Sequence, residues 1–328
     1  MHLIDPSSRA PLLELIEQGA LPPEQIPAAL ELTQLHPNRQ QWCQFIDLLL
    51  LWIGGLALAF SLMFFIAYNW DSLGRFAKFA MVEVFMAACI AAYWRWHQHA
   101  MVSKLTILMT CLGLGVLLAL FGQTYQTGAD PWELFFNWAL LMLPWTLLAR
   151  FPALWILWLG LLNLSAILYH QVFRNTFDLL FPSDISLMWT LLLLNTLALV
   201  CWELLAKKQD WLQTVWATRV IAVAAGFAAT SLAFYGIFDS SANMLMHVMA
   251  WFAFIAALFS YYRYRQPDLF MLAAGCLSAI AVIVALAAKN VLRTLDDAGG
   301  FLLIALMIIG LSAAAAVWLR KVHKELDV

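Results

Sequence analysis

One stretch of the chain decides the fold: QFIDLLLLWIGGLALAFSLMFFIAY, residues 44–68. After Asp47 this stretch reaches Tyr68 without another charged side chain. About 20 apolar residues are enough for a helix to cross a hydrocarbon core of ~30 Å. Within lipid, a helix satisfies its own backbone N–H and C=O groups. The stretch therefore predicts a membrane-spanning helix.

Nine further apolar runs follow with short connections between them. The predicted spans are 44–68, 75–94, 104–123, 132–149, 151–170, 185–205, 213–237, 242–262, 268–288 and 298–319. The weakest boundary lies after residue 149, where Arg150 and Pro152 favour a tight turn, because proline lacks the N–H that a helix interior needs. The sequence predicts an all-α membrane protein, a bundle of about ten transmembrane helices.

The composition supports a multi-pass membrane protein. Hydrophobic residues make up 64% of the 328 residues, charged residues make up 12%, and the mean hydropathy is +0.81. A water-soluble chain of this composition could not cover itself with polar surface. No basic stripe points to nucleic acid. Membrane lipids are the expected partners, and nucleic acid is not.

The sequence predicts no metal, no cofactor and no catalytic residue. The cysteines lie in or beside apolar runs without a CxxC pair and are expected to pack as small apolar residues. They are Cys43, Cys89, Cys111, Cys201 and Cys276. His97 and His99 provide two ligands, which do not make a zinc site. No P-loop, GxSxG, HExxH or Rossmann pattern is present.

Residues 1–42 are more polar than the first span. They contain two amphipathic stretches, SRAPLLELIEQG and PPEQIPAALELTQL. Gly19 is placed to end the first helix, and Pro22 and Pro23 are placed to open the second. We predict a cytoplasmic helical hairpin. Because it is too small to fold alone, it is expected to dock on the membrane domain or on another membrane protein. The first span is expected to stay in the mature protein.

Lysine and arginine are distributed unevenly over the predicted loops. An even number of spans places both termini on one side, and thirteen of the eighteen basic residues fall on that side. These are Arg9, Arg39, Arg95, Lys104, Arg150, Lys207, Lys208, Arg219, Arg263, Arg265, Arg320, Lys321 and Lys324. The other side has Arg75, Lys78, Arg174, Lys289 and Arg293. By the positive-inside rule, both the N and C termini are predicted to be cytoplasmic.

Many of the sixteen tryptophans lie at predicted span ends. They include Trp70, Trp94, Trp96, Trp132, Trp145, Trp211 and Trp318. An interfacial aromatic belt is the interpretation that explains most of them.

The outer ends of the first four spans carry more polar side chains than a membrane surface requires. AYNWDSLGRFAKF closes the first span, and FGQTYQTGADPWELFFNW joins the third to the fourth. Their polar groups are predicted either to bind a ligand in one periplasm-facing pocket or to cap helix ends and join the hairpins. The residues of this outer pocket are Asn69, Trp70, Asp71, Gln123, Tyr125, Gln126, Asp130 and Asn137.

Helix capping explains part of the second polar stretch. Asp130 is predicted to be the N-cap residue of the fourth span, with Pro131 at the first helical position and Glu133 near the positive end of the helix dipole. Capping leaves Gln123, Tyr125, Gln126 and the intramembrane Asn137 unexplained.

Two ionisable residues lie within the predicted spans. Glu83 lies near the middle of the second span, where a carboxylate costs on the order of 2.5 to 3.5 kcal/mol on insertion scales. It is expected to face the bundle interior, carry a proton or have a partner. Arg219, in the seventh span, is placed either to reach Glu83 or to extend to the cytoplasmic interface. Asn163, Asn195 and Thr196 are typical of interhelical hydrogen bonds.

Three motifs together resemble a known family. LLELIEQGALPPEQIPAAL lies near the N-terminus at residues 12–30, Asn69-Trp70 follows the first span, and Gly122-Gln123-Thr124-Tyr125 precedes the fourth. These motifs are similar to those of bacterial membrane proteins of the domain-of-unknown-function family 2157. The resemblance covers about residues 10–150 and implies a polytopic protein of a bacterial inner (plasma) membrane, without an assigned activity. The Leu-Pro-Pro of the hairpin departs from the family pattern, in which Ser or Thr is more usual.

The motifs and the spans divide the chain into three predicted parts. Residues 1–42 form the cytoplasmic amphipathic hairpin, and residues 43–150 form the first four spans with the family-like motifs. Residues 151–328 form six further spans and a short cytoplasmic tail.

Three functional hypotheses are consistent with these patterns. The first is binding or transport of a small polar solute or a lipid headgroup through the outer pocket, with proton coupling through Glu83. The second is an accessory or scaffold subunit that holds a partner membrane protein through residues 1–42. The third is an intramembrane transferase on a lipid-linked substrate, with Asp71 or Asp130 as base. An enzyme is the least favoured, because neither a second close carboxylate nor a metal set accompanies these residues.

Overall fold

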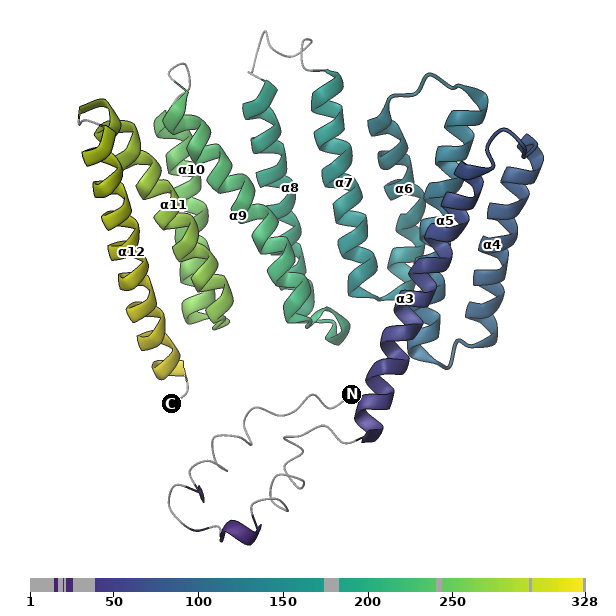
Figure 1. Cartoon of the computed structure of the whole chain (residues 1–328), viewed down its shortest axis with the longest axis horizontal. Helices are drawn as coiled ribbons and strands as arrows, with labels where there is room; N and C mark the ends of the chain where they lie inside the picture. Colours follow the sequence, from purple (N-terminus) through teal and green to yellow (C-terminus); the bar gives the residue numbers. More distant parts are fainter. Residues whose placement is uncertain are drawn as a thin grey trace. The chain divides into compact units, whose positions relative to one another are not determined.

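The computed structural model describes residues 15–16, 20, 22–25, 39–173, 183–239, 244–294 and 297–326, and every regular element among them is helical. The first is a 3₁₀ turn, η2 (Pro23–Gln25). The helices that follow are α3 (Arg39–Tyr68), α4 (Arg75–Arg95), α5 (Ala100–Tyr125), α6 (Pro131–Ala149), α7 (Pro152–Val172), α8 (Ser183–Ala206), η3 (Asp210–Leu212), α9 (Val215–Phe238), α10 (Met244–Tyr264), α11 (Leu269–Thr294) and α12 (Asp297–Leu326) (Figure 1).

Ten of these helices are long and apolar enough to cross a membrane, so the ten predicted spans are confirmed. The weakest boundary is also confirmed. Arg150 adopts a left-handed conformation (φ 47°, ψ 44°), and Pro152 opens α7. Proline is favoured at this position, because the first N–H of a helix has no partner within the helix.

The predicted N-terminal hairpin falls largely outside the described residues. Within it, Leu15 and Ile16 are helical, and Pro23–Gln25 forms the 3₁₀ turn η2, while the rest of the predicted second helix lies outside the described residues. The helix α3 begins at Arg39, five residues before the predicted span.

The described helices fall into two compact units, Met1–Gly113 and Leu114–Val328, with the boundary inside α5. The three-part division drawn from the motifs stays a prediction.

In unit 1, a small core joins α3, α4 and α5. Ala59, Leu105 and Met109 are buried there, and Phe85 and Cys89 of α4 pack against them. Gly55 is needed for the close approach of two helices, since a Cβ atom there would lie 2.8 Å from the Leu105 side chain. Small residues allow this kind of approach between membrane helices.

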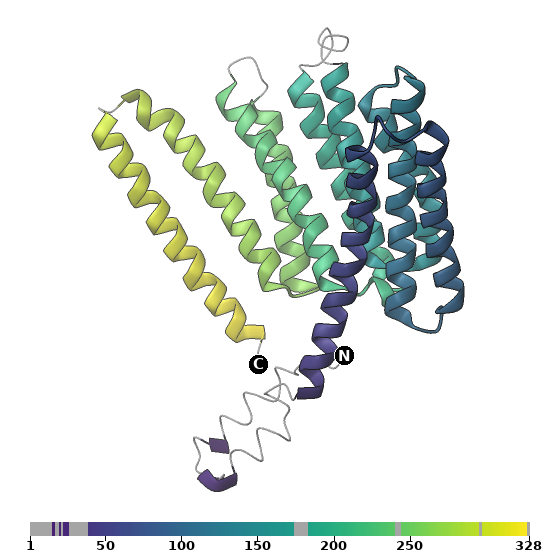
Figure 2. The ribbon, with the colours of Figure 1, turned by 45° about the vertical axis from the view of Figure 1, so that its right-hand side comes forward.

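In unit 2, α9 is the central helix and packs against α7, α8, α10 and α11. Its buried side chains are mainly small: Ala217, Ala222, Ala225, Ala228, Ala229, Ala233 and Gly236. The antiparallel pair α11 and α12 lies side by side in both views (Figures 1 and 2).

Hydrogen bonds between helices supplement this packing in unit 2. Asn163 of α7 and Asn195 of α8 donate to each other's Oδ1 atoms, at 3.1 and 2.6 Å, so their predicted role is confirmed. The same prediction is wrong for Thr196, whose buried hydroxyl has no hydrogen-bond partner among the described residues. Ser278 of α11 lies 2.6 Å from the Thr230 hydroxyl of α9 and accepts from the Trp251 indole of α10 at 2.9 Å. Such bonds matter here because lipid provides little hydrophobic force between helices.

Candidate functional site

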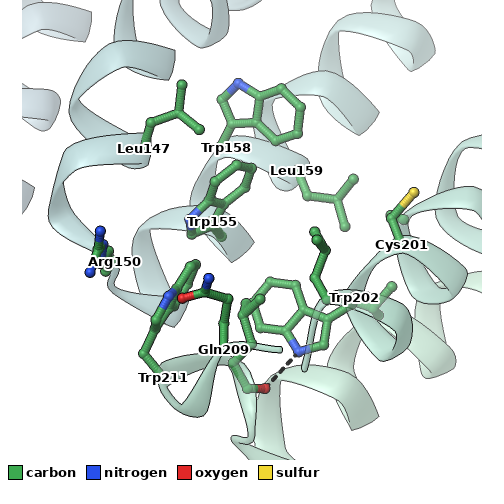
Figure 3. Close-up of a pocket in the computed structure, with 13 residues that line it drawn as sticks. Leu147, Arg150, Trp155, Trp158, Leu159, Cys201, Trp202, Gln209 and Trp211 are labelled. Atoms are coloured by element: carbon green, nitrogen blue, oxygen red, sulfur yellow. Dashed lines mark hydrogen bonds between the residues drawn. The ribbon is translucent and has the colours of Figure 1, made fainter. Parts of the chain in front are cut away.

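A pocket of about 350 Å³ lies in unit 2, at the end of the helices where α6 turns into α7 and α8 leads into η3 (Figure 3). Four tryptophans, from α7, α8 and η3, dominate its walls. The lining residues are Leu147, Arg150, Trp155, Trp158, Leu159, Ala198, Cys201, Trp202, Leu205, Gln209, Trp211, Leu212 and Ile221. We call this site the tryptophan pocket.

The spacing of residues on α7 and α8 directs these side chains to one place. Trp155 and Trp158 are three residues apart, and side chains at this spacing share one face of a helix. On α8 the lining residues recur with spacings of three and four, which produces a single stripe. They are Ala198, Cys201, Trp202 and Leu205.

The tryptophan rings hold one another in fixed orientations. Trp155 meets Trp158 edge to face, with ring centroids 5.6 Å apart. It also stacks on Trp211, with centroids 6.4 Å apart and an interplanar angle of 27°. Offset stacked and edge-to-face arrangements are the favoured ones for aromatic pairs. The rings therefore form a preformed wall of the pocket.

The indole N–H groups differ in how they are satisfied. Trp158 Nε1 donates to the carbonyl of Ala139 at 3.0 Å, and Trp202 Nε1 donates to the carbonyl of Leu212 at 3.1 Å (Figure 3). Trp155 Nε1 is buried and has no hydrogen-bond partner in the described part of the chain. A buried donor of this kind is costly unless something accepts from it.

The charge at the pocket is positive. Arg150 lines it from the α6–α7 turn, on the same side as Trp155 and Trp211 (Figure 3), and none of the lining residues is acidic. The tryptophan pocket thus combines apolar walls, one unsatisfied N–H and one guanidinium. This arrangement suits an amphipathic molecule with an acceptor or anionic group at one end.

The sequence does not predict this pocket. Its pattern places Trp211 in the aromatic belt and gives Trp155, Trp158 and Trp202 no separate role. The spacing of three between Trp155 and Trp158 was a visible signal. Nothing in the sequence indicated that this face of α7 meets α8 and η3.

In unit 1, the predicted outer-pocket residues have local partners. Asn69 Nδ2 donates to the carbonyl of Phe65 at 2.9 Å, one turn earlier in the chain. The Trp70 ring lies under the ammonium of the buried Lys78, with 3.5 Å from Nζ to the ring centroid. Asp71 is exposed. A local structural role therefore accounts for Asn69 and Trp70.

In unit 2, Gln123, Tyr125 and Gln126 lie at the end of α5 and are exposed. The N–H of Thr127 donates to the carbonyl of Gly122 at 3.4 Å, and Gln126 has a φ of 47°. A left-handed residue after the last turn is a common way to end a helix. The second motif therefore contains a helix stop that sequence analysis did not predict.

Asp130 occupies the predicted N-cap position of α6, and Pro131 follows it at the first helical position. The backbone carbonyl of Asp130 accepts from the N–H of Glu133 at 3.0 Å, but its carboxylate makes no capping hydrogen bond. Asn137 is exposed on α6. The two groups of outer-pocket residues belong to different units, and their meeting stays a prediction.

The two intramembrane ionisable residues have different surroundings. Within unit 1, Glu83 is exposed and has no hydrogen-bond or ion-pair partner among the described residues, while its neighbour Val82 is fully buried. Val82 takes the inward face of α4 within this unit, and the expected position of Glu83 in the interior of the whole bundle stays a prediction. Arg219 forms two bonds of 3.0 Å to the carboxylate of Asp268, which gives it a partner without Glu83.

The ten apolar helices define a multi-pass helical membrane protein. Residues 13–155 match the family described as "Predicted membrane protein (DUF2157)". The resemblance found in the three motifs is therefore confirmed for this part of the chain. The matched range includes Arg150 and Trp155 of the tryptophan pocket but ends before α8. No curated protein and no solved structure matches the chain.

Proposed function

We propose that this protein binds an amphipathic molecule with an anionic head group in the tryptophan pocket. The observation that carries the proposal is the unsatisfied N–H of Trp155, which is one of the residues that line an apolar pocket bordered by Arg150. A head-group oxygen would accept from Trp155 Nε1, and the guanidinium would balance its charge. The apolar part would lie among the four indole rings.

The position of the pocket supports a membrane lipid as its ligand. We infer a bacterial inner (plasma) membrane with both termini cytoplasmic, from the family resemblance and from the distribution of lysine and arginine. In unit 2, the α6–α7, α8–α9 and α10–α11 turns lie at one end of the helices (Figure 1). With this orientation, the pocket lies at the cytoplasmic interface, where anionic head groups are found.

Of the sequence hypotheses, this proposal keeps the binding of a lipid headgroup. Within unit 2, it puts the binding site at the end of α6 opposite to Asp130. Transport through that outer pocket and a scaffold role through residues 1–42 stay predictions.

The test is lipid binding to the full-length protein in mild detergent, measured by native mass spectrometry. The probes are phosphatidylglycerol and phosphatidylcholine with identical acyl chains. We expect the wild type to retain phosphatidylglycerol preferentially. Arg150→Gln should weaken its binding about fivefold, since one basic residue near an anionic surface contributes ~1 kcal/mol. Trp155→Phe keeps an aromatic ring but removes the N–H. It should weaken phosphatidylglycerol binding about fivefold, because one hydrogen bond contributes ~1 kcal/mol.

Arg265→Gln is the matched control, because Arg265 is exposed after α10 and does not line the pocket. It should retain phosphatidylglycerol as the wild type does. If Arg150→Gln and Arg265→Gln weaken phosphatidylglycerol binding equally, the lipid is held by the general positive charge of the surface, which would contradict the proposal. Equal retention of both lipids by the wild type would contradict it too.

A further inference from the structure

A second cavity, of about 340 Å³, lies at the same end of unit 2 as the tryptophan pocket. Its lining is more polar than that of the tryptophan pocket. It lies between the end of α8, the start of α9 and the α10–α11 turn. Polar and charged groups contribute much of its wall. The lining residues are Glu203, Ala206, Lys207, Leu212, Gln213, Thr214, Val215, Thr218, Tyr262, Gln266, Pro267, Asp268 and Met271.

Glu203 is the buried charged group of this cavity, with 7% of its surface exposed. The Tyr262 hydroxyl donates to its Oε1 at 2.7 Å, and the Tyr261 hydroxyl donates to its Oε2 at 3.1 Å. Both carboxyl oxygens therefore act as acceptors, as they do in a carboxylate. No Lys, Arg or His side chain in the described part of the chain forms an ion pair with Glu203.

The other charges at the cavity are already balanced or exposed. Asp268 accepts two bonds from Arg219 and one of 2.8 Å from the N–H of Phe270. Lys207 directly follows the last residue of α8, four residues after Glu203, but its side chain is exposed, and no ion pair joins the two. The buried negative charge of Glu203 is therefore left without a counter-ion, which is unfavourable away from water.

The remaining polar atoms of the cavity favour a ligand that donates hydrogen bonds. Gln266 presents Oε1, which lies 3.3 Å from the Tyr261 hydroxyl. Thr214 Oγ1 is buried and has no partner among the described residues. A primary ammonium has three donors and one positive charge. The volume exceeds that of a bare metal ion and leaves room for a short carbon chain.

We propose that this cavity binds a small organic cation with a primary ammonium group, and that Glu203 is its counter-ion. Tyr261 and Tyr262 hold the carboxylate in place from α10. Lys207 competes with the ligand, because its ammonium can reach the same cavity from the surface.

The experiment is isothermal titration of full-length protein in mild detergent with ethylammonium chloride, and with sodium chloride at the same ionic strength. We expect saturable binding of ethylammonium. Glu203→Gln keeps the shape of the side chain and should weaken binding more than tenfold. Lys207→Gln removes the competing cation and should strengthen binding. Glu325→Gln is the control, because Glu325 is exposed, pairs with Arg263 and does not line the cavity.

Gel filtration and thermal unfolding establish that each variant is folded. If Glu203→Gln does not fold, Lys207→Gln decides the question, and unchanged affinity in that variant contradicts the proposal. Sodium binding as tight as ethylammonium binding would overturn it, as would wild-type affinity in Glu203→Gln. Arg150 and Trp155 are not involved, so failure here is distinguishable from failure of the lipid proposal.

Discussion

The tryptophan pocket and the polar outer stretches are built in different ways. The pocket brings together side chains from α6, α7, α8, η3 and α9, residues far apart in the sequence. In the outer stretches, Asn69 bonds to Phe65 and the N–H of Thr127 bonds to Gly122, each within a few residues. These two hydrogen bonds of the outer stretches are thus local. The pocket has no contiguous motif.

This difference predicts the size of mutational effects. Substitutions in the packed part of unit 2 should be costly, because they leave cavities or unpaired groups between helices. Substitutions in the outer stretches should change stability little, because each removes a local contact. A large effect in an outer stretch would mean that its side chains have partners beyond their own turn.

The largest loss of stability is expected for Trp202→Ala. Trp202 is buried and bonds to the carbonyl of Leu212, so truncation opens a cavity and releases η3. Large-to-small changes of this kind cost ~3–5 kcal/mol. The measurement is the free energy of unfolding from titration with sodium dodecyl sulfate. Trp145→Ala is the control and should cost far less, because this tryptophan of α6 is 36% exposed.

A smaller loss of stability, measured as the free energy of unfolding, is expected for Asn163→Leu. The substitution breaks the reciprocal amide pair with Asn195 and leaves that buried side chain with its bond to Leu191 alone. Polar pairs between membrane helices contribute ~1–2 kcal/mol in model systems. Asn137→Leu makes the same change at an exposed position and should cause no loss. If both variants lose the same stability, Asn137 has a partner, and the contrast between the two regions fails.

The sequence predicts the spans well because the signal for each is local. A run of about 20 apolar residues has no other stable conformation in lipid, and Pro152 marks the one weak boundary. The sequence does not specify which faces of these runs meet, because membrane helices are apolar all round. Trp155 and Trp158 therefore looked like any other interfacial tryptophans. Glu203, four residues before Lys207, resembled an ordinary span end, and only the fold brings Tyr261 and Tyr262 to it.

A gain in stability is expected for Gln126→Gly. Gln126 has a φ of 47°, which costs a residue with a Cβ atom ~1 kcal/mol and costs glycine little. Gln123→Gly is the matched control, because Gln123 lies in the last turn of α5, where glycine should lower stability by up to ~1 kcal/mol. Thermal unfolding in detergent should shift in opposite directions for the two variants. A loss with Gln126→Gly would show that its side chain has a stabilising role outside the helix stop.

The smallest change in stability is expected for Asp130→Ala. An N-cap carboxylate that bonds to its helix contributes ~1 kcal/mol, but the carboxylate of Asp130 makes no such bond, so the loss should stay below ~0.5 kcal/mol. The measurement is again the free energy of unfolding, in the absence of added solutes. A loss well above ~1 kcal/mol would mean that the carboxylate is paired across the outer surface. In that case the double variant with Asn69→Ala should show a coupling energy of at least ~0.5 kcal/mol, as residues in contact do. If the two losses of free energy simply add, the side chains of Asn69 and Asp130 do not interact.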